Sequence, residues 1–337
     1  MPPEPLPASS RVTLGDRLGH LRVRWGIGRK RFRVTPGLYA LGAPGPAAPV
    51  FVSANYRLSY DLLRRSLAGR DAWILVLDSN GVNVWCAAGK GTFGTAELVS
   101  RVGATGLAAR VTHRTLVVPQ LGATGISAPE TERLSGFRVV FGPVRAADLP
   151  DFLDHGMEAT PGMRRVTFTL ADRLTLLPVE LLQALPWSLP VLAALVLLAG
   201  FAGGSWSVTT MASAAPAVLA AGVGATLAGA TLTPLLLPWI PPRAFAAKGA
   251  LLGATWAVAA VAVVLRPVGA LATAGWLLLL PALAAFLAMN FTGASVITSL
   301  SGVRREMRVA LPLEIAAAAL GLGLLAAGAL AGGALRG

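Results

Sequence analysis

The stretch "NVWCAAGKGTFGT", residues 83–95, carries the single cysteine of this 337-residue chain. Cys86 follows an aromatic residue, Trp85, and precedes a run of small residues that reaches Gly89. Lys90, one of only three lysines in the chain, comes next and would favour a thiolate nearby. A thiolate is both a nucleophile and a soft metal ligand, so the stretch combines a reactive sulfur with a nearly flat surface.

The glycines of the same stretch also satisfy the pattern G-x-G-x-x-G, with Gly89, Gly91 and Gly94. In a dinucleotide site the first glycine follows a strand directly, and an acidic residue stands about 20 positions later. Here ten residues separate Asp78 from Gly89, and no acidic residue occupies the later position. A P-loop is excluded more firmly, because Gly91 stands where serine or threonine should follow Lys90.

Two interpretations of the cysteine then remain. A free cysteine is often a buried, small hydrophobic residue, which would make Cys86 a simple core position. Alternatively, the flat surface receives a large planar cofactor, and the thiol faces its metal. One protein ligand is enough if the cofactor supplies the other ligands, and the small residues around Cys86 favour this second interpretation.

Beyond these features, "NVWCAAGK" resembles the signature of the mercury-methylating corrinoid protein family, HgcA. Further segments resemble that family in the same order along the chain: "PGLYALG", "APVFVSANYRLSYD", "AWILVLD", "GKGTFGT", "VVPQLGA", "FGPVRAADLP", "MRRVTFT" and "LPVEL". The N-terminal part is also similar to the corrin-binding domain of the corrinoid iron–sulfur protein large subunit. Departures from the family pattern fall at residues 78–81 and 120–130, around the edge and tail of the expected cofactor.

The resemblance implies that Cys86 is the catalytic residue and the lower axial ligand to the cobalt of a cobalamin-type corrinoid. It implies a cofactor site made of Asn83, Val84, Trp85, Cys86, Ala87, Ala88, Gly89, Lys90, Gly91, Thr92, Gly94, Thr95, Gln120, Gly122, Gly142 and Pro143. The usual lower ligand of cobalamin methyltransferases is a histidine in a D-x-H-x-x-G motif. His20, His113 and His155 lie outside such a motif, and we expect them on the surface or in loops.

The function implied by the resemblance is transfer of a methyl group from cobalt to inorganic Hg(II). The alternative is a corrinoid methyl carrier of one-carbon or acetyl-CoA metabolism. Transfer of the methyl group as a carbanion equivalent would leave the cobalt oxidised, and the metal must be reduced before it accepts another methyl group. Because one cysteine cannot hold an iron–sulfur cluster, these electrons must come from a partner, which by resemblance is the ferredoxin-like protein HgcB. A methyl-donor protein or methylfolate is a further expected partner. The basic N-terminal part carries no nucleic-acid motif, so nucleic acid is not expected. The arginines from Arg22 to Arg33 are instead expected to face membrane lipid of anionic character or an acidic partner.

Composition places part of this chain in a membrane. Apolar residues make up 54% of it, and the mean hydropathy is +0.64. Leu181 to Pro242 contains no charged residue, and neither does Pro267 to Val303 or Ile315 to Leu335. Residues 1–180 instead carry 22 Lys+Arg and 14 Asp+Glu, a net charge of +8 that is ordinary for a globular domain. The sequence therefore predicts an N-terminal domain over 1–180 and a transmembrane domain over 181–337.

The length of apolar segments predicts five transmembrane helices, since one span needs about 20 residues. The expected spans are 186–203, 211–240, 249–265, 269–292 and 311–331, with a break near Pro234 and Pro238 in the second. Among the acidic and basic residues, only Glu314 falls within an expected span. Its expected place is the first turn of the fifth span, near the membrane interface. The absence of other intramembrane charges predicts an anchor and not a transporter.

The distribution of basic residues predicts the orientation in the cytoplasmic membrane. The loops after the second and fourth spans contain Arg243, Lys248, Arg304, Arg305 and Arg308. Arg266 and Arg336 are the basic residues of the other side. These loops and the N-terminal domain are therefore expected in the cytoplasm, with the C-terminus outside. The first 35 residues contain no continuous apolar stretch, so no signal peptide is expected.

The N-terminal domain alternates short apolar runs with amphipathic ones, which predicts an α/β, Rossmann-like fold with a mostly parallel sheet. The expected strands are 50–53, 72–77, 115–119, 137–141 and 165–169, and the expected helices are 59–67, 95–102, 128–134 and 145–153. Ser127 and Glu130 have the spacing of a capping box. Cys86 follows the most apolar strand, where such sheets hold their ligands.

Overall fold

The computed structural model describes residues 3–202, 205–266, 269–291 and 300–334. The chain divides into two compact units, Met1–Val166 and Thr167–Gly337, here called the N-terminal unit and the helical unit. The predicted boundary near residue 180 lies inside the first helix of the helical unit, α7 (Leu170–Leu198). This helix begins with a capping box, in which the Thr169 side chain and the Asp172 carboxylate exchange hydrogen bonds with each other's backbone amides.

The N-terminal unit is built on a six-stranded sheet with the order β1-β2-β4-β3-β5-β6. Strands β4, β3, β5 and β6 are parallel, as predicted, while β2 pairs antiparallel with β4 and parallel with β1. The strands are β1 (Leu6–Ala8), β2 (Gly37–Leu41), β3 (Val50–Ala54), β4 (Ala72–Leu77), β5 (Thr115–Val118) and β6 (Arg138–Phe141).

The order of the strands creates a switch point between β3 and β5. The chain leaves β3 for β4 on one side, and then returns past β3 to form β5 and β6 on the other. The connections therefore run in opposite directions from this point, and a crevice opens at the carboxyl ends of the two strands.

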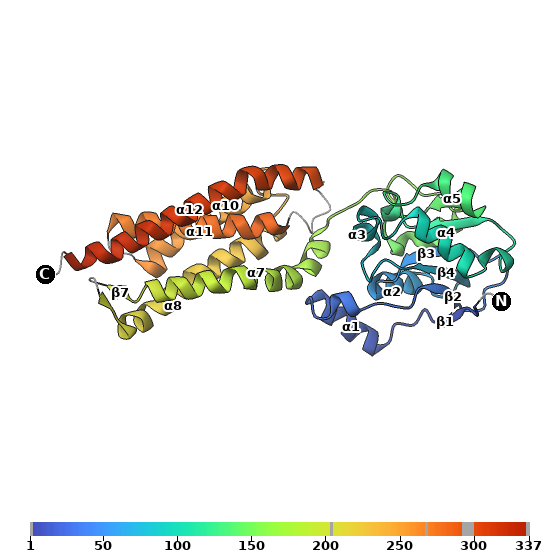
Figure 1. Ribbon diagram of the computed structural model, residues 1–337, viewed down its shortest axis with the longest axis horizontal. Coiled ribbons are helices and arrows are strands. Elements are labelled where there is room, and N and C mark those ends of the chain that lie inside the picture. Colours follow the sequence, from blue (N-terminus) through green and yellow to red (C-terminus); the bar gives the residue numbers. More distant parts are fainter. Residues whose placement is uncertain (1–2, 203–204, 267–268, 292–299, 335–337) are drawn as a thin grey trace. The chain divides into compact units, whose positions relative to one another are not determined.

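Helices cover both faces of this sheet, as Figure 1 shows for α4 and α5 on one side and α2 on the other. Leu98 and Val102 of α4 pack on the face that carries Leu75, and Leu63 of α2 packs on the face that carries Ile74. The helices and 3-10 turns of the unit are α1 (Leu14–Arg24), η1 (Arg29–Arg31), α2 (Arg57–Ser66), α3 (Val84–Gly89), α4 (Thr95–Ala104), η2 (Leu107–Ala109), η3 (Gln120–Gly122), α5 (Ala128–Ser135), η4 (Ala146–Asp148) and α6 (Leu149–Asp154).

Four of the five predicted strands form, and the fifth prediction, 165–169, is wrong. This segment is extended but largely exposed, and it leads directly into α7 without a neighbouring strand. The sequence analysis missed β1 and β2, as well as α1, which begins with a capping box between Thr13 and Asp16. The capping spacing at Ser127 was recognised, and its hydroxyl accepts from the Glu130 amide at 3.4 Å.

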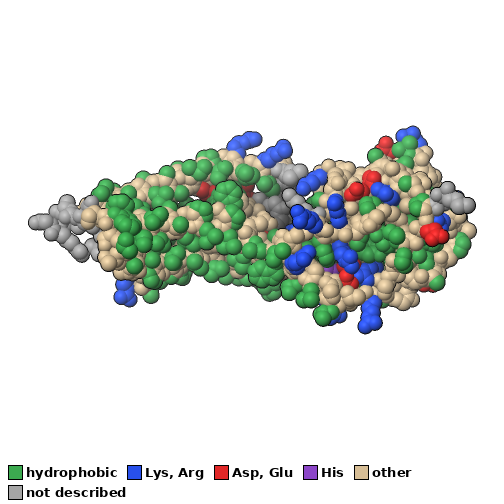
Figure 2. All heavy atoms as spheres, turned by 60° about the horizontal axis from the view of Figure 1, so that its bottom comes forward, with side chains coloured by type: hydrophobic (Ala, Val, Ile, Leu, Met, Phe, Trp, Pro, Cys, Tyr) green, Lys and Arg blue, Asp and Glu red, His purple; other side chains and the backbone are tan. Residues whose placement is uncertain are grey.

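The helical unit contains five helices that are long and apolar enough to cross a membrane, as the sequence predicts. These candidate spans are Leu170–Leu198, Val208–Leu235, Phe245–Leu265, Ala270–Asn290 and Ser301–Ala331. Hydrophobic side chains form most of the visible surface of this unit in Figure 2, whereas charged side chains concentrate on the N-terminal unit.

The elements of the helical unit are α7, β7 (Phe201–Ala202), β8 (Ser205–Trp206), α8 (Val208–Leu227), the π-helix η5 (Ala228–Leu232), α9 (Thr233–Leu235), α10 (Phe245–Ala259), the π-helix η6 (Ala260–Leu265), α11 (Ala270–Asn290) and α12 (Leu300–Ala334). The predicted ends at Gly203 and Thr292, and the terminal Arg336 and Gly337 used for orientation, lie outside the described residues.

The second span ends at Leu235 and not at Ile240, at the break that the sequence predicts near Pro234 and Pro238. Cationic side chains bind the carbonyls that follow the last turn. The Lys248 ammonium donates to the carbonyls of Leu237, at 2.7 Å, and Ile240. Arg173 of α7 donates to the Leu235 carbonyl. Lys248, predicted in a loop, is therefore a buried residue of α10 that satisfies the end of a broken helix.

Glycines set the packing of the helical unit. A Cβ on Gly321 of α12 would lie 2.9 Å from the Gly275 carbonyl of α11, and one on Gly253 of α10 would lie 2.6 Å from the Ala284 side chain. Small residues at such crossings let helix backbones approach closely, which is how helices associate in lipid.

The helix that carries Glu314 begins earlier than the predicted fifth span. Because α12 begins at Leu300, Glu314 lies about four turns inside the helix at 3.6 residues per turn. It is 7% exposed. Neither of its carboxylate oxygens has a hydrogen-bond partner among the described residues.

A buried ion-pair network fastens α1 to α2. Asp16 of α1 binds Arg57 at 2.6 Å and Arg64 at 2.9 Å, and His20 binds Asp61 at 2.7 Å. Arg64 also pairs with Asp61 at 2.7 Å. Burial raises the pKa of Asp16, but hydrogen bonds from Thr13, Arg57 and Arg64 outweigh it and leave the pKa far below the ordinary value.

Replacing Asp16 with Asn should loosen α1. Because the pKa of Asp16 is lower in the folded than in the unfolded chain, its carboxylate stabilises the fold at neutral pH, and this contribution falls as the pH drops below 3.8. Loss of hydrogen bonds to a charged group should cost about 1.5–3 kcal/mol. Hydrogen exchange of the full chain, followed by mass spectrometry at pH 7, should show faster exchange in residues 14–24. Unchanged exchange in this helix would contradict the assignment.

Replacing Glu314 with Leu should stabilise the helical unit by about 1–3 kcal/mol, because an unpartnered carboxylate leaves a buried position. The measurement is the thermal midpoint of the detergent-solubilised chain. Glu306→Leu is the matched control on the same helix: its carboxylate accepts from the Ala246 amide at 2.7 Å, so this substitution should lower the midpoint. Equal shifts in both variants would contradict the prediction.

Candidate functional site

Six residues separate the end of β4 from α3, the helix that carries Cys86. Asn83 caps it, and the Asn83 side-chain oxygen accepts from the Cys86 amide at 2.9 Å. Asparagine is a preferred residue at this position because it pairs a backbone N–H that the helix leaves free. The "NVWC" order therefore has a structural meaning: the cap and the cysteine are three residues apart and fix each other's backbone.

The loop between β4 and α3 is anchored by a buried carboxamide. The Asn55 oxygen accepts from the Ser79 amide at 3.1 Å, the Ser79 hydroxyl at 2.8 Å and the Gly81 amide at 2.9 Å. Its nitrogen donates to Asp78 at 2.9 Å. Asn55 is 1% exposed and Ser79 is fully buried. The "DSNG" segment, which departs from the family pattern, thus forms an ordered turn.

The other end of α3 turns back on itself before α4. The Ala87 carbonyl accepts from the amides of Thr92 at 3.0 Å and Phe93 at 3.2 Å. Gly91 has a φ of +80°, which an L side chain rarely adopts. The G-x-G-x-x-G glycines therefore shape a helix–helix turn, and the structure gives them no part in a strand-to-helix phosphate loop.

A second loop, which contains Gly125, packs against the end of α3. A Cβ on Gly125 would lie 2.2 Å from the Phe93 carbonyl oxygen and 3.0 Å from the Ala88 Cα, so only glycine fits there. The Thr95 amide donates to the Gly125 carbonyl at 3.2 Å. Segment 120–130, the other departure from the family pattern, is therefore the platform on which α3 rests.

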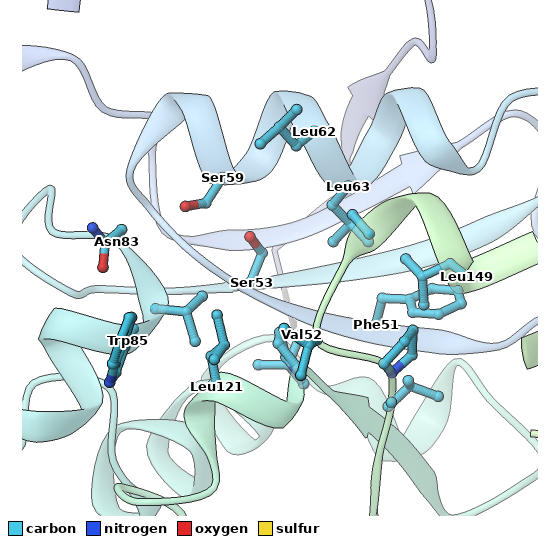
Figure 3. Close-up of a pocket in the computed structure, with 17 residues that line it drawn as sticks. Phe51, Val52, Ser53, Ser59, Leu62, Leu63, Asn83, Trp85, Leu121 and Leu149 are labelled. Atoms are coloured by element: carbon cyan, nitrogen blue, oxygen red, sulfur yellow. The ribbon is translucent and has the colours of Figure 1, made fainter. Parts of the chain in front are cut away.

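A pocket of about 290 Å³ opens beside α3 at the switch point of the sheet. Figure 3 shows Ser53, Ser59 and Asn83 grouped toward one end and Phe51 and Leu149 toward the other. Its lining residues are Phe51, Val52, Ser53, Ser59, Leu62, Leu63, Asn83, Val84, Trp85, Val117, Pro119, Leu121, Gly142, Pro143, Val144, Ala146 and Leu149. The pocket thus has a polar end next to α3 and an apolar end between α2 and α6.

Cys86 is exposed, which contradicts the interpretation of a buried, hydrophobic cysteine. Gly89, one turn further along the same helix, is also exposed, and a Cβ there would meet no atom within 4 Å. On the inner side, Ala87 and Ala88 are buried against the sheet. The thiol therefore stands on an open, small-residue face of a helix that is held on its other face.

The structure brings the predicted site residues together in two layers. Asn83, Val84, Trp85, Gly142 and Pro143 line the pocket. Gly122 packs against the Phe93 ring, where a Cβ would lie 2.6 Å from Cε1. The Thr95 hydroxyl accepts from the Ser127 amide, so both residues support the turn that follows α3. Gln120 accepts from Arg164 at 3.2 Å.

Sequence reasoning missed Ser53, Asn55 and Ser59, although a signal was present. The strand "VFVSA" is apolar except for its serine, and an asparagine follows directly, which is unusual for a fully buried strand end. Polar residues at the carboxyl end of a central parallel strand are candidates for ligand contacts or loop anchors.

The histidines are occupied by structural contacts. His113 accepts from the Thr115 amide at 3.2 Å and donates to the Ala48 carbonyl at 2.9 Å. His155 donates to the Asp151 carbonyl, and His20 pairs with Asp61. Within the described ranges no three His, Cys, Asp or Glu side chains cluster as metal ligands.

Fold and site together define a doubly wound α/β domain with a ligand pocket at its switch point and an exposed thiol beside it. Residues 23–153 match the family described as CO dehydrogenase/acetyl-CoA synthase delta subunit. The chain is also similar to acetyl-CoA decarbonylase/synthase complex subunit gamma of Archaeoglobus fulgidus, with 33% identity over 128 residues, and of Methanopyrus kandleri, with 35% over 129.

Each of these alignments covers 37% of this chain and 27% of the relative. The chain thus spans about a quarter of the length of these relatives. The match supports the predicted corrinoid cofactor and a relation to corrinoid proteins of methyl transfer. The helical unit lies beyond the matched segment.

Gly125→Ala should destabilise the site by about 1–3 kcal/mol, because the new methyl group meets backbone atoms that cannot move independently. Gly103→Ala is a matched control: it lies in α4, where a Cβ meets nothing within 4 Å, and alanine favours the helix. Hydrogen exchange of residues 84–95 in the full chain should increase in the first variant alone. Similar exchange in both variants would contradict the platform role of Gly125.

Proposed function

We propose that this chain is a membrane-attached, corrinoid-dependent methyltransferase that passes a methyl group from cobalt to inorganic Hg(II). The observation that carries the proposal is the exposed Cys86 thiol, fixed on α3 next to the switch-point pocket. The similarity of residues 23–153 to acetyl-CoA synthase subunits supports the corrinoid part. The mercury part follows from the resemblance of "NVWCAAGK" to the HgcA family signature.

The residues present fit a corrinoid. Such a cofactor would supply a cobalt ion that carries the methyl group. Cys86 would hold this metal through its sulfur, and the missing side chain at Gly89 leaves the helix face open to a flat ring. The pocket, at about 290 Å³, would receive a peripheral part of the cofactor, with Ser53, Ser59 and Asn83 at its polar end.

The rigid setting of Cys86 matters for the reaction. Asn83 and the Gly125 platform hold α3 from both ends, so the sulfur keeps one position through the cycle. A thiolate is a softer and stronger donor than imidazole, and the axial ligand is a main control of a cofactor's reactivity. Electron donation by sulfur favours transfer of the methyl group to a soft electrophile, and Hg(II) is one.

A second candidate is a corrinoid methyl carrier of one-carbon or acetyl-CoA metabolism. It is favoured by the names of the relatives, which are subunits of an acetyl-CoA decarbonylase/synthase complex. In either case the single cysteine leaves no ligands for an iron–sulfur cluster, so we propose a ferredoxin-like partner, HgcB, as the electron donor. The methyl group would come from a methyl-donor protein or methylfolate.

We also propose the cytoplasmic membrane as the location, with the N-terminal unit in the cytoplasm and the C-terminus outside. Arg304, Arg305 and Arg308 lie on the first turns of α12, and Arg243 precedes α10, so these charges flank the same ends of two helices. An excess of basic residues marks the cytoplasmic side of membrane proteins.

The test compares the purified full chain with Cys86→Ala and Cys86→Ser, each loaded with a methylated corrinoid and mixed with Hg(II). Cys86→Ala should lose the spectroscopic signature of sulfur on cobalt. The amount of methylmercury that it forms should fall by more than about 100-fold. Cys86→Ser keeps the size of the side chain but not the soft sulfur donor, so it should lose the same spectroscopic signature and the same activity as Cys86→Ala. Ser100→Ala, an exposed change on α4, is the control that should retain both.

Two results would overturn the proposal. An identical cobalt spectrum in the wild type and Cys86→Ala would remove the axial role of Cys86. Methyl transfer to an acetyl-CoA synthase acceptor, without any transfer to Hg(II), would favour the methyl carrier and would leave the axial ligand in place. The cobalt spectrum therefore tests the role of Cys86, and the identity of the methyl acceptor separately tests the mercury reaction.

A further inference from the structure

We propose that α1 is an interfacial helix that lies on an anionic lipid surface and holds the N-terminal unit against the bilayer. The proposal concerns a surface remote from the thiol, and it does not depend on the identity of the methyl acceptor. It rests on the shape of one exposed apolar stripe, on the contacts that fix the opposite face, and on the charges that border the stripe.

The stripe consists of Leu14, Leu18, Leu21 and Trp25, which are 73%, 58%, 55% and 43% exposed. Their spacing of four, three and four residues places them within about 60° of arc on a helix that turns 100° per residue. Ile27, 57% exposed, extends the stripe beyond the helix end. Five large apolar side chains in one exposed line are uncommon on a soluble surface and indicate an interaction site.

The opposite face of α1 is fixed to the unit, so the stripe cannot turn inward. Val23 is 1% exposed and Asp16 is 8% exposed. Asp16 pairs with Arg57 and Arg64, and Asp61 of α2 accepts from His20. The helix is therefore held by a polar inner face, and its hydrophobic face points to the outside, which is the reverse of an ordinary surface helix.

Basic residues border the stripe on both sides. Arg17 and Arg22 are exposed and flank it in opposite directions on the helix, each about 60–80° from its centre. Residues 11–31 contain seven Lys and Arg and one acidic residue, Asp16, which the ion-pair network already neutralises. Leucine and tryptophan between arginines are typical of helices that lie in the interface of an anionic membrane.

Lipid fits this surface better than a protein partner does. Stable protein interfaces bury about 800 Å² on each side, which is more than one narrow line of side chains can offer. The same chain carries five helices of membrane length, so a bilayer is always close to the N-terminal unit and weak lipid contacts act at high effective concentration. Most of the stripe also precedes residue 23, where the family match begins.

The test places a nitroxide label at Leu18→Cys in the full chain, in a Cys86→Ser background, and reconstitutes it in nanodiscs. Discs of phosphatidylcholine alone are compared with discs that also contain phosphatidylglycerol. In the anionic discs the collision rate of the label with a water-soluble nickel complex should fall by at least about threefold, and its collision rate with oxygen should rise. A label at Glu132→Cys, exposed on α5, is the matched control and should stay accessible in both.

A second variant isolates the charges. Arg17→Gln with Arg22→Gln leaves the Asp16 network intact, so α1 should keep its slow hydrogen exchange while the protection of the Leu18 label in anionic discs falls. The proposal is overturned if the Leu18 label is equally open to the nickel complex in both kinds of disc. It is also overturned if the label is protected equally in both and the arginine changes have no effect, because a protein surface would then cover the stripe.

Discussion

The hydrogen bonds of Asn55 determine where the thiol of this protein can be. A buried carboxamide at the end of β3 accepts three hydrogen bonds from residues 79–81 and donates one to Asp78. Leaving such buried groups unpaired would cost about 1–3 kcal/mol each, so the loop has one low-energy arrangement. Since α3 starts just after this loop, Cys86 takes its position from the central strand of the sheet and not from a mobile connection.

Helix α2 connects two properties of the N-terminal unit. One side of it lines the pocket through Ser59, Leu62 and Leu63. Another side receives α1 through the pairs of Arg64 with Asp16 and of Asp61 with His20. Because a rigid helix links these contacts, the orientation of α1 and the orientation of the pocket are coupled. Any surface that binds α1 therefore also sets the direction in which the pocket opens.

Much of the architecture could be predicted from composition and periodicity. Buried parallel strands read as unbroken apolar runs, which is why "AWILVL" and "TLVV" were found at β4 and β5. The absence of charge over long segments predicted the five helices that are long and apolar enough to cross a membrane. Strand β2, "GLYAL", was missed because its flanking proline and glycines resemble a turn, and α1 was missed because its apolar residues face outward, against the usual pattern.

The helix ends near Lys248 and Glu314 and the contacts that hold α3 could not be predicted, because they depend on tertiary contacts. Lys248 was expected in a loop, but helix α10 extends over it because two carbonyls of the preceding segment bind its ammonium group. Glu314 was expected at a helix start, but α12 begins eleven residues before the predicted span. At the site, the exposure of Cys86 agreed with the sequence argument, whereas the Asn55 anchor and the Gly125 platform come from segments distant in the chain.

The exposed position of Cys86 also has a consequence for the protein in the presence of oxidants. With a single cysteine, no internal disulfide can protect the sulfur, so oxidation of the free thiol leads to a sulfenic acid and then to irreversible sulfinic and sulfonic acids. Two molecules can also be joined through their thiols. A metal bound to the sulfur would shield it from both reactions, so metal binding at this position would compete directly with oxidative damage.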